Sequence, residues 1–155
     1  MRLGPVLCRG VTAADAPALA QLADQLGYPV SALEVLGRLE RLLERQRHGD
    51  RERVIVAEGP QALVLGWTSC RLCEPPHEPA HVEIAGFVVD RSARRQGVGR
   101  ALMEAVAVWG REQGVRSIHL GANVLREDAH GFYAALGFRE VKRQVRFTRA
   151  IDPAP

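Results

Sequence analysis

The chain has 155 residues, of which 46% are hydrophobic and 25% charged, and its formal net charge is +3. This composition is that of one globular domain, which can form a core without disulfides or metals, and it includes no apolar run long enough to span a membrane. Because aromatic residues make up only 5% of the chain, we expect no nucleic-acid interface of clustered basic and aromatic residues, whereas the mild positive charge suits capture of a small polyanion.

The first fifty residues predict a short strand followed by two helices. Residues 3–9 have the pattern of the strand, and Arg9 interrupts an apolar stretch too short for a signal peptide, so we expect a cytoplasmic location. Apolar residues then recur at helical spacing over 18–26 and 33–43, and Gly27 ends the first helix. Each helix follows a capping box, Thr12 with Asp15 and Ser31 with Glu34.

Three strand patterns follow one another in the middle of the chain, over residues 54–57, 63–72 and 81–89. The turn from Glu58 to Gln61 joins the first two, and a proline-rich loop over 74–80 separates the second from the third. Strands joined by such short connections favour antiparallel pairing.

Two cysteines, Cys70 and Cys73, form a Cys-x-x-Cys pattern that a zinc or redox site could use, and the nearest further ligands are His77 and His81. Positions three apart on a strand point to opposite faces, which opposes a shared ligand set. The three cysteines of the chain also do not fit a disulfide framework. We therefore interpret them as structural thiols and expect no metal.

The last third of the chain predicts a helix over 97–113, a short strand over 117–120, a helix over 128–136 and a final strand over 138–149. A strand, helix and strand in succession favour a parallel pair. We therefore expect a mixed α/β, α+β-like fold in a single domain over residues 1–155, with a central, mostly antiparallel sheet flanked by helices. The alternating residues near the C-terminus offer a strand edge, so we also expect a homodimer.

The chemistry is concentrated where the strand ending at Val89 leads through a basic turn into the helix that begins near Gly97. The first backbone N–H groups of a helix lack helical partners and lie at the positive end of its dipole, so they bind phosphate oxygens. Glycines allow the backbone to approach a ligand closely. This junction carries two glycines and three arginines, Gly97, Gly99, Arg94, Arg95 and Arg100.

Three phosphate ligands could use such a junction. A nucleoside triphosphate site needs Gly-Lys-Ser or Gly-Lys-Thr, and Gly99 is followed by Arg100 and Ala101 instead. A dinucleotide site needs a third small residue where Leu102 stands, and a βαβ unit at the start of the chain. A pyrophosphate without a catalytic metal remains, and coenzyme A carries one.

These residues resemble the GNAT superfamily of N-acetyltransferases. Arg94-x-x-Gly97-x-Gly99 is similar to its acetyl-CoA signature, Arg/Gln-x-x-Gly-x-Gly/Ala, and residues 129–138 resemble its C-terminal motif, a helix that carries Tyr133 and ends in Gly-Phe. The resemblance implies the GNAT fold and an enzyme that transfers acetyl from acetyl-CoA to a primary amine of a small molecule, by direct attack in a ternary complex. Two alternatives stay open, a protein lysine or N-terminal acetyltransferase and a non-catalytic acyl-CoA-binding domain.

The resemblance also implies where acetyl-CoA binds. The strand before the signature diverges from its neighbour over 117–120, and Ala85-Gly86 is the expected position of the β-bulge that opens them. The pantetheine arm would pair with the backbone there like an added strand. The residues implied in cofactor binding are Phe87, Val88, Val89, Arg94, Arg95, Gln96, Gly97, Val98, Gly99, Arg100, Ala101, Asn123 and Phe132.

Two residues are implied in proton transfer. Glu83 falls where a glutamate base lies in some relatives and would take the proton of the amine, directly or through water; the alternative is a strand glutamate facing solvent. Tyr133 corresponds to the general acid that protonates the departing thiolate; the alternative is a packed aromatic residue.

The chain departs from the family pattern at Arg126, where many relatives have an Asn. Asn123, three residues earlier, takes over that role in our assignment, and His130 is interpreted as an exposed helix residue. The sequence does not identify the acceptor. Its pocket could include Tyr28, Trp67 and Cys70, each of which could equally be a core residue.

Overall fold

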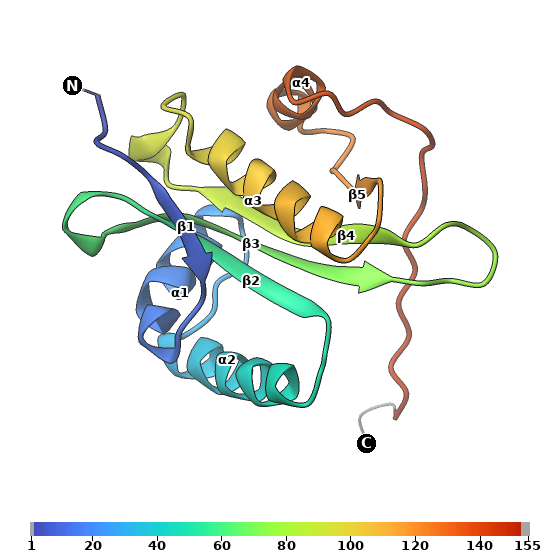
Figure 1. Ribbon diagram of the computed structural model, residues 1–155, viewed down its shortest axis with the longest axis horizontal. Coiled ribbons are helices and arrows are strands. Elements are labelled where there is room, and N and C mark those ends of the chain that lie inside the picture. The colour runs from blue at the N-terminus through green and yellow to red at the C-terminus, as the bar shows by residue number, and fades with distance from the viewer. Residues whose placement is uncertain (1, 153–155) are drawn as a thin grey trace. The chain divides into compact units, whose positions relative to one another are not determined.

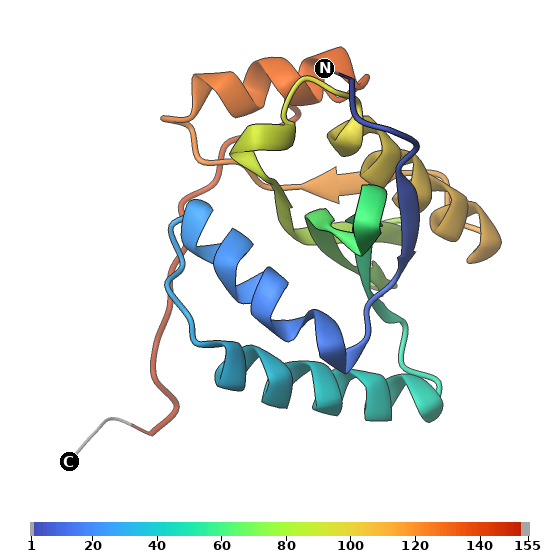
Figure 2. The ribbon, with the colours of Figure 1, turned by 90° about the vertical axis from the view of Figure 1, so that its left-hand side faces the viewer.

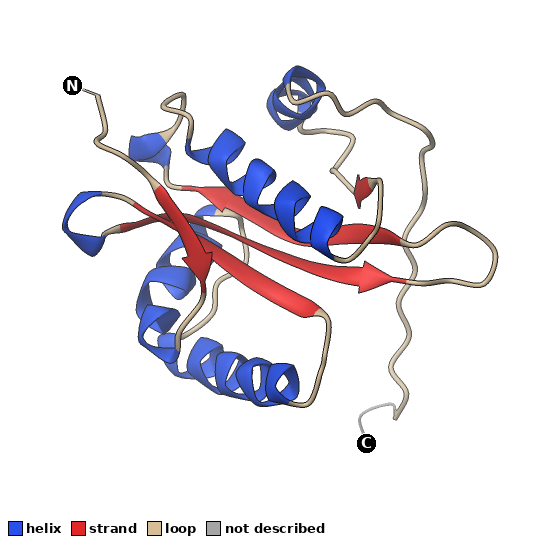
Figure 3. Ribbon diagram, viewed as in Figure 1, coloured by secondary structure: helices blue, strands red, loops and turns tan. Residues whose placement is uncertain are grey.

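The computed structural model describes residues 2–152 and divides the chain into two compact units, residues 1–121 and residues 122–155. The first unit holds a five-stranded sheet in the order β1-β2-β3-β4-β5 and three helices (Figures 1 and 3). Its strands are β1 (Leu7–Gly10), β2 (Glu52–Glu58), β3 (Val64–Cys73), β4 (His81–Val89) and β5 (Ile118–Leu120). Its helices are α1 (Ala16–Gln25), α2 (Ala32–Arg47) and α3 (Val98–Glu112), and the second unit contains α4 (Glu127–Ala135).

The sheet is mixed, as the sequence predicts. Strands β1 to β4 pair antiparallel with their neighbours, and β5 pairs parallel to β4 after the crossover through α3. In the first unit, α3 covers one face of the sheet, and α1 and α2 cover the other (Figure 2). The expected mixed α/β fold, mostly antiparallel and flanked by helices, is therefore confirmed.

Local capping contacts start α2 and the short 3-10 helix Ala13–Asp15 that leads into α1. The Ser31 hydroxyl accepts a hydrogen bond of 3.1 Å from the Glu34 N–H and so caps α2. The Asp15 carboxylate accepts from the Thr12 N–H at 2.8 Å, which is the reciprocal half of a capping box. Gly27 follows α1 with a φ of 93°, a left-handed conformation that favours glycine and ends the helix.

Buried apolar residues fill the space between the sheet and the N-terminal helices. Leu19 and Leu22 of α1 and Leu39 and Leu42 of α2 pack with Val56 of β2 in one cluster. On the opposite face, Leu102 and Val106 of α3 are completely buried. These two cores pack against opposite faces of the sheet. Among the described residues, no helix combines the length and the apolar character that crossing a membrane requires.

The predicted last strand over 138–149 is wrong. Residues 138–150 form neither helix nor strand, and Figure 3 draws them as a loop. Alternation of apolar and charged residues predicts a strand only where a neighbouring strand pairs with it and one face becomes buried. Here the alternating apolar side chains stay exposed, Val141 and Val145 at 78% and Phe147 at 89%.

Candidate functional site

A β-bulge interrupts β4 at the position that the sequence predicts. Ser69 of β3 pairs with Gly86, whereas the next residue, Cys70, pairs with Ile84, so Ala85 is an extra residue without a counterpart on β3. A bulge of this kind bends its strand and breaks the alternation of faces. A side chain at Gly86 would also meet the Trp67 ring, 2.8 Å from the added Cβ, so the bulge is fitted to a large aromatic neighbour.

The bulge changes which face of the sheet each β4 residue occupies. Val82 lies on the α3 face, because its Cγ2 is 3.4 Å from the Cβ position of Gly110 in α3. Gly86 lies on the opposite face with Trp67, although four positions normally return a strand to the same side. His81 and Glu83 alternate with Val82 and therefore share the face of Gly86.

Pairing between β4 and β5 ends at the bulge. The parallel register runs from Val82 with Ile118 to Ile84 with Leu120 and goes no further. Beyond this point the Asp90 N–H donates to the Leu65 carbonyl of β3, so by alternation the backbone groups of Val89 and Phe87 point away from β3. The edge of β4 after the bulge is therefore turned toward the side from which β5 has diverged.

The turn between β4 and α3 has two residues in left-handed backbone conformations, Arg95 with a φ of 63° and Gly97 with a φ of 85°. For a residue other than glycine this conformation costs about 1–2 kcal/mol. Left-handed residues orient successive backbone N–H groups into a concave surface that binds anions, and such strain concentrates at ligand sites.

The N-terminus of α3 continues this surface. Gly97 is its N-cap and offers no side chain to the first turn, and the first helical bond runs from Ala101 N–H to the Gly97 carbonyl, at 3.0 Å. The N–H groups of Val98, Gly99 and Arg100 consequently have no helical partner. The result is a row of backbone donors at the positive end of a long helix, with the chemistry of an anion site.

Arginines surround these donors. Arg94, Arg95 and Arg100 are all exposed, and Arg94 Nε donates to the Val89 carbonyl at 3.3 Å, which ties the turn back to the end of β4. The Gln96 side-chain carbonyl accepts a hydrogen bond of 3.1 Å from the Leu3 N–H. Gln96 therefore helps to order the turn, and its side chain is not reserved for a ligand.

Glu83 is half-buried and does not simply face solvent. Its register partners are Arg71 on β3 and His119 on β5, and its Oε2 lies 3.7 Å from Nε2 of the buried His81. His81 is two positions from Glu83 on the predicted strand, so strand alternation already puts the two residues on one face. His119 is brought beside them only by the parallel register of β4 and β5.

Tyr133 lies in the second unit, at the end of the second turn of α4. Its ring makes edge-to-face contacts with Phe132 and Phe138, with centroids 5.3 and 5.9 Å away. Burial raises the pKa of Tyr133 above its usual range, and the smaller effect of Arg126 lowers it. The phenol is therefore protonated at neutral pH, the form that a general acid requires.

Asn123 orders the turn before α4. Its side-chain oxygen accepts from the Leu125 N–H at 2.9 Å, and its backbone carbonyl accepts from the Arg126 N–H at 3.0 Å and lies 2.9 Å from His130 Nε2. These contacts give Asn123 and His130 a structural part in the second unit. A role of Asn123 in cofactor binding stays a prediction.

The three residues suggested for an acceptor pocket do not share one face. Trp67 packs with the core under α1 and α2, whereas Cys70, an odd number of positions later on an unbroken β3, points to the opposite face. Burial raises the pKa of the Cys70 thiol to about 12, so it is an unreactive core residue. Tyr28 is exposed.

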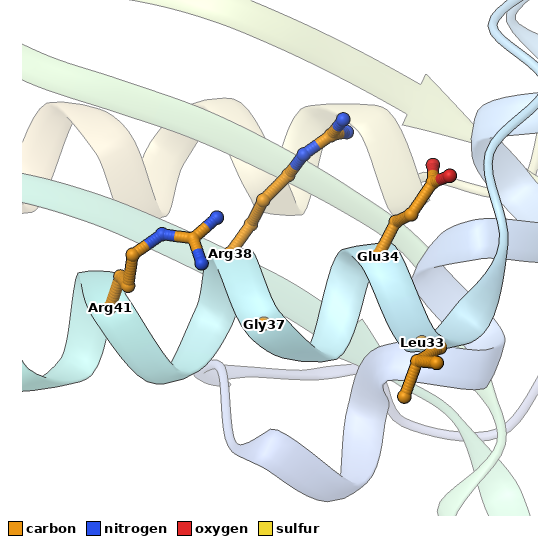
Figure 4. A pocket seen from close by; sticks show the side chains of 5 residues that line it. All are labelled: Leu33, Glu34, Gly37, Arg38 and Arg41. Carbon is orange, nitrogen blue, oxygen red and sulfur yellow. The ribbon is translucent and has the colours of Figure 1, made fainter.

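A shallow hollow on α2 is not part of this site. Its lining side chains come from one helix and point outward, as Figure 4 shows for Leu33, Glu34, Gly37, Arg38 and Arg41. A hollow formed by a single helix encloses no ligand, so we assign it no function.

Comparisons with known proteins agree with this geometry. A family model described as "Acetyltransferase (GNAT) family" matches residues 21–138. Aminoglycoside N(6')-acetyltransferase type 1 from Stenotrophomonas maltophilia is 32% identical over 151 residues, which cover 94% of each chain.

Solved structures are similar in fold over nearly the whole chain. The aminoglycoside N-acetyltransferase AAC(6')-Iy in complex with CoA has a TM-score of 0.78 at 20% identity, covering 94% of this chain and 95% of that one. AAC(6')-Iy in complex with the bisubstrate analogue CoA-S-monomethyl-acetylneamine has the same TM-score at 21% identity, covering 95% and 99%. At these identities the likeness concerns the fold.

Proposed function

Because the chain belongs to the GNAT family of acetyltransferases, we propose that it transfers the acetyl group of acetyl-CoA to a primary amine of a small molecule. The observation that carries this proposal is the combination of the bulge at Ala85 with the glycine-opened N-terminus of α3, on consecutive segments of one chain. A thioester with a pyrophosphate in its long arm fits that pair of features.

The donor side of the proposal uses backbone groups and charge. The N–H groups of Val98, Gly99 and Arg100 would bind the pyrophosphate, with Arg94 and Arg95 adding positive charge. The backbone of Phe87 to Val89 would pair with the amides of the pantetheine arm. An N–H group of this segment would also stabilise the negative charge that develops on the thioester oxygen.

The proposed class of acceptor amine is inferred from the related enzymes. The Stenotrophomonas maltophilia enzyme, which this chain matches over 94% of both lengths, is named for acetylating aminoglycosides. Amino sugars of that class carry several primary amines, and a carboxylate such as Glu83 would bind one of them. We therefore propose amino sugars as the first acceptor class to test.

The proposed reaction takes two protons from the amine nitrogen and gives one to the sulfur of CoA. An alkylammonium has a pKa of about 10.4, so it must lose a proton before its nitrogen attacks the thioester carbon. Glu83 would take that proton, directly or through water. As the C–S bond breaks, the Tyr133 hydroxyl would protonate the departing thiolate. The attacking nitrogen would lose its second proton to the tyrosinate so formed, directly or through water, and solvent would take the first proton from Glu83.

The test is a screen of primary amines with acetyl-CoA, in which CoA-thiol release and the mass of the acetylated amine are both measured. We expect release that depends on an amino sugar, together with a product that carries one acetyl group. Equal or faster acetylation of lysine peptides or protein N-termini would overturn the small-molecule acceptor. Absence of acetyl transfer to every amine class would overturn the proposed reaction itself.

A further inference from the structure

Two histidines and a glutamate meet at the start of β4, on the face of the sheet that carries Glu83. Glu78 lies in the loop before β4, His81 is the first residue of β4, and His119 is the middle residue of β5. One ligand atom of each lies within 4.8 Å of the others, and the two imidazole rings stack with centroids 3.8 Å apart. All three belong to the first unit, and the sheet sets the arrangement of the two histidines.

The surroundings of His81 fix its tautomer. Its Nδ1 lies 3.1 Å from the Pro79 carbonyl, which can only accept, so Nδ1 carries the hydrogen and Nε2 of the neutral ring carries a lone pair. Nε2 lies 3.7 Å from Glu83 Oε2, and His81 is only 4% exposed. A histidine whose second nitrogen donates to a backbone carbonyl is the common form of a metal ligand.

We propose that Glu78, His81 and His119 bind a Zn²⁺ ion. Two imidazole nitrogens and one carboxylate oxygen are a ligand set that zinc accepts, with a water in the fourth position, whereas Mg²⁺ and Ca²⁺ prefer oxygen ligands. The Ser117 hydroxyl, 3.4 Å from His119 Nε2, lies beside the set.

The ligands need a modest rearrangement to hold the ion. Zn–N bonds of about 2.0–2.1 Å place tetrahedral ligands about 3.3 Å apart. The present ligand atoms lie within 4.8 Å of one another, so they must draw together. His119 must also rotate out of its stack, because a metal lies in the plane of each imidazole. The side chains of His119 and Glu78 can make these movements because both residues are exposed, and only His81 is buried.

Bound zinc would oppose acetyl transfer, a consequence that rests on the proposed function. Glu83 Oε2 is 3.7 Å from His81 Nε2, so an ion on that nitrogen attracts the Glu83 carboxylate. A carboxylate drawn toward the ion would no longer lie free to bind the acceptor amine. The site would therefore make the enzyme sensitive to zinc without taking part in catalysis.

Calorimetric titration of the full-length protein with ZnCl₂ tests the site directly. We expect one ion per chain with a micromolar dissociation constant, weakened about tenfold or more in both Glu78→Gln and His119→Gln. His77→Gln is the matched control, because His77 is an exposed histidine next to Glu78 and outside the cluster, and it should bind as the wild type does.

Three outcomes would overturn the site: no zinc binding by the wild type, unchanged binding in both ligand variants, or equal weakening in His77→Gln. Loss of binding confined to a Cys73→Ser variant would also overturn it, since the ion would then be held elsewhere.

A second measurement tests the effect on turnover by mass spectrometry of the acetylated amine, because zinc also binds the thiol of free CoA. Zinc should lower turnover of the wild type and have at least a tenfold weaker effect on His119→Gln. If no acceptor amine is found, the calorimetric result still decides the metal site on its own.

Discussion

Glu83 and Tyr133 would have opposite tasks in proton transfer, and their surroundings differ accordingly. Glu83 is half-buried on a strand beside two histidines, whereas Tyr133 is packed between two phenylalanines on a helix. The sequence alone could identify both residues through the family pattern, but it could not show either environment. His81 is on the same strand as Glu83, but His119 comes from a strand 36 positions later, through a register that no local pattern encodes.

Replacing Glu83 with Gln should lower turnover about 10²–10⁴-fold at neutral pH, because the amide cannot accept the proton of the amine. The defect should shrink as pH rises, since free amine then becomes abundant without a base. A pH–rate profile of both proteins with an amine from the screen measures this. Parallel profiles for the variant and the wild type would exclude Glu83 as the base.

Replacing Tyr133 with Phe should lower turnover without that recovery at high pH and should barely change acetyl-CoA affinity. Burial raises the pKa of Tyr133, so its hydroxyl stays protonated throughout the neutral and mildly alkaline range. Single-turnover rates and cofactor titrations of the variant separate the two effects. A loss below about tenfold, close to 1.4 kcal/mol of barrier, would mean that Tyr133 only packs or positions.

Among the secondary-structure elements, β4 and α3 were the most predictable. β4 spans the predicted residues 81–89, α3 begins one residue after the predicted start, and the bulge occurs within the predicted Ala85-Gly86 pair. Strong periodicity, a proline-rich loop before β4 and glycines at the junctions explain this success. The strand predicted over 138–149 failed because pairing depends on a neighbour, and alternation alone does not supply one.

A network of ion pairs links β1 to β2 and to the residue that precedes α1. Arg9 of β1 makes two hydrogen bonds of 2.9 Å to the Asp15 carboxylate and one of 2.7 Å to Glu58 of β2. The Asp15 side chain is 7% exposed and that of Arg9 29%. The hydrogen bonds from Arg9 lower the pKa of Asp15, so the charged carboxylate stabilises the folded state.

Replacing Asp15 with Asn should lower the free energy of unfolding at pH 7 by about 2 kcal/mol. A depressed carboxyl pKa contributes stability above the unfolded pKa, and this contribution is lost as pH falls through the folded pKa. The difference between variant and wild type should therefore narrow in acid. Urea titrations at several pH values measure this difference in the free energy of unfolding. Asp24→Asn is the control, because it removes the same charge from an exposed position on α1. A constant difference across the acid range would contradict the network.

At the scale of the whole molecule, two expectations stay predictions. One is that residues 1–155 act as a single domain, since the structure resolves two compact units. The other is the homodimer. The strand edge on which we based it is absent, but the same segment leaves four large apolar side chains exposed, Val141, Val145, Phe147 and Ile151. Exposed apolar groups of this kind favour association.

Light scattering across the micromolar range should therefore give the mass of a dimer, and Val145→Asp together with Phe147→Asp should shift it toward a monomer. The double variant keeps every residue of the proposed acetyl-CoA site in the first unit. A monomer mass for the wild type at all concentrations would remove the dimer.

The bulge in β4 and the N-terminus of α3 together form the proposed acetyl-CoA site. Calorimetric titration with acetyl-CoA tests this site by comparing the wild type with Gly99→Asp. The added carboxylate would occupy the position of the pyrophosphate and repel its negative charge. Gly37→Asp on α2 is the control, because it adds the same charge at a position far in sequence from the proposed site and next to Arg41. An exposed second variant, Arg100→Glu, covers the case in which Gly99→Asp does not fold. We predict micromolar binding by the wild type and by Gly37→Asp, with binding abolished in Gly99→Asp and weakened in Arg100→Glu. Unchanged binding in folded Gly99→Asp and Arg100→Glu proteins would contradict the account.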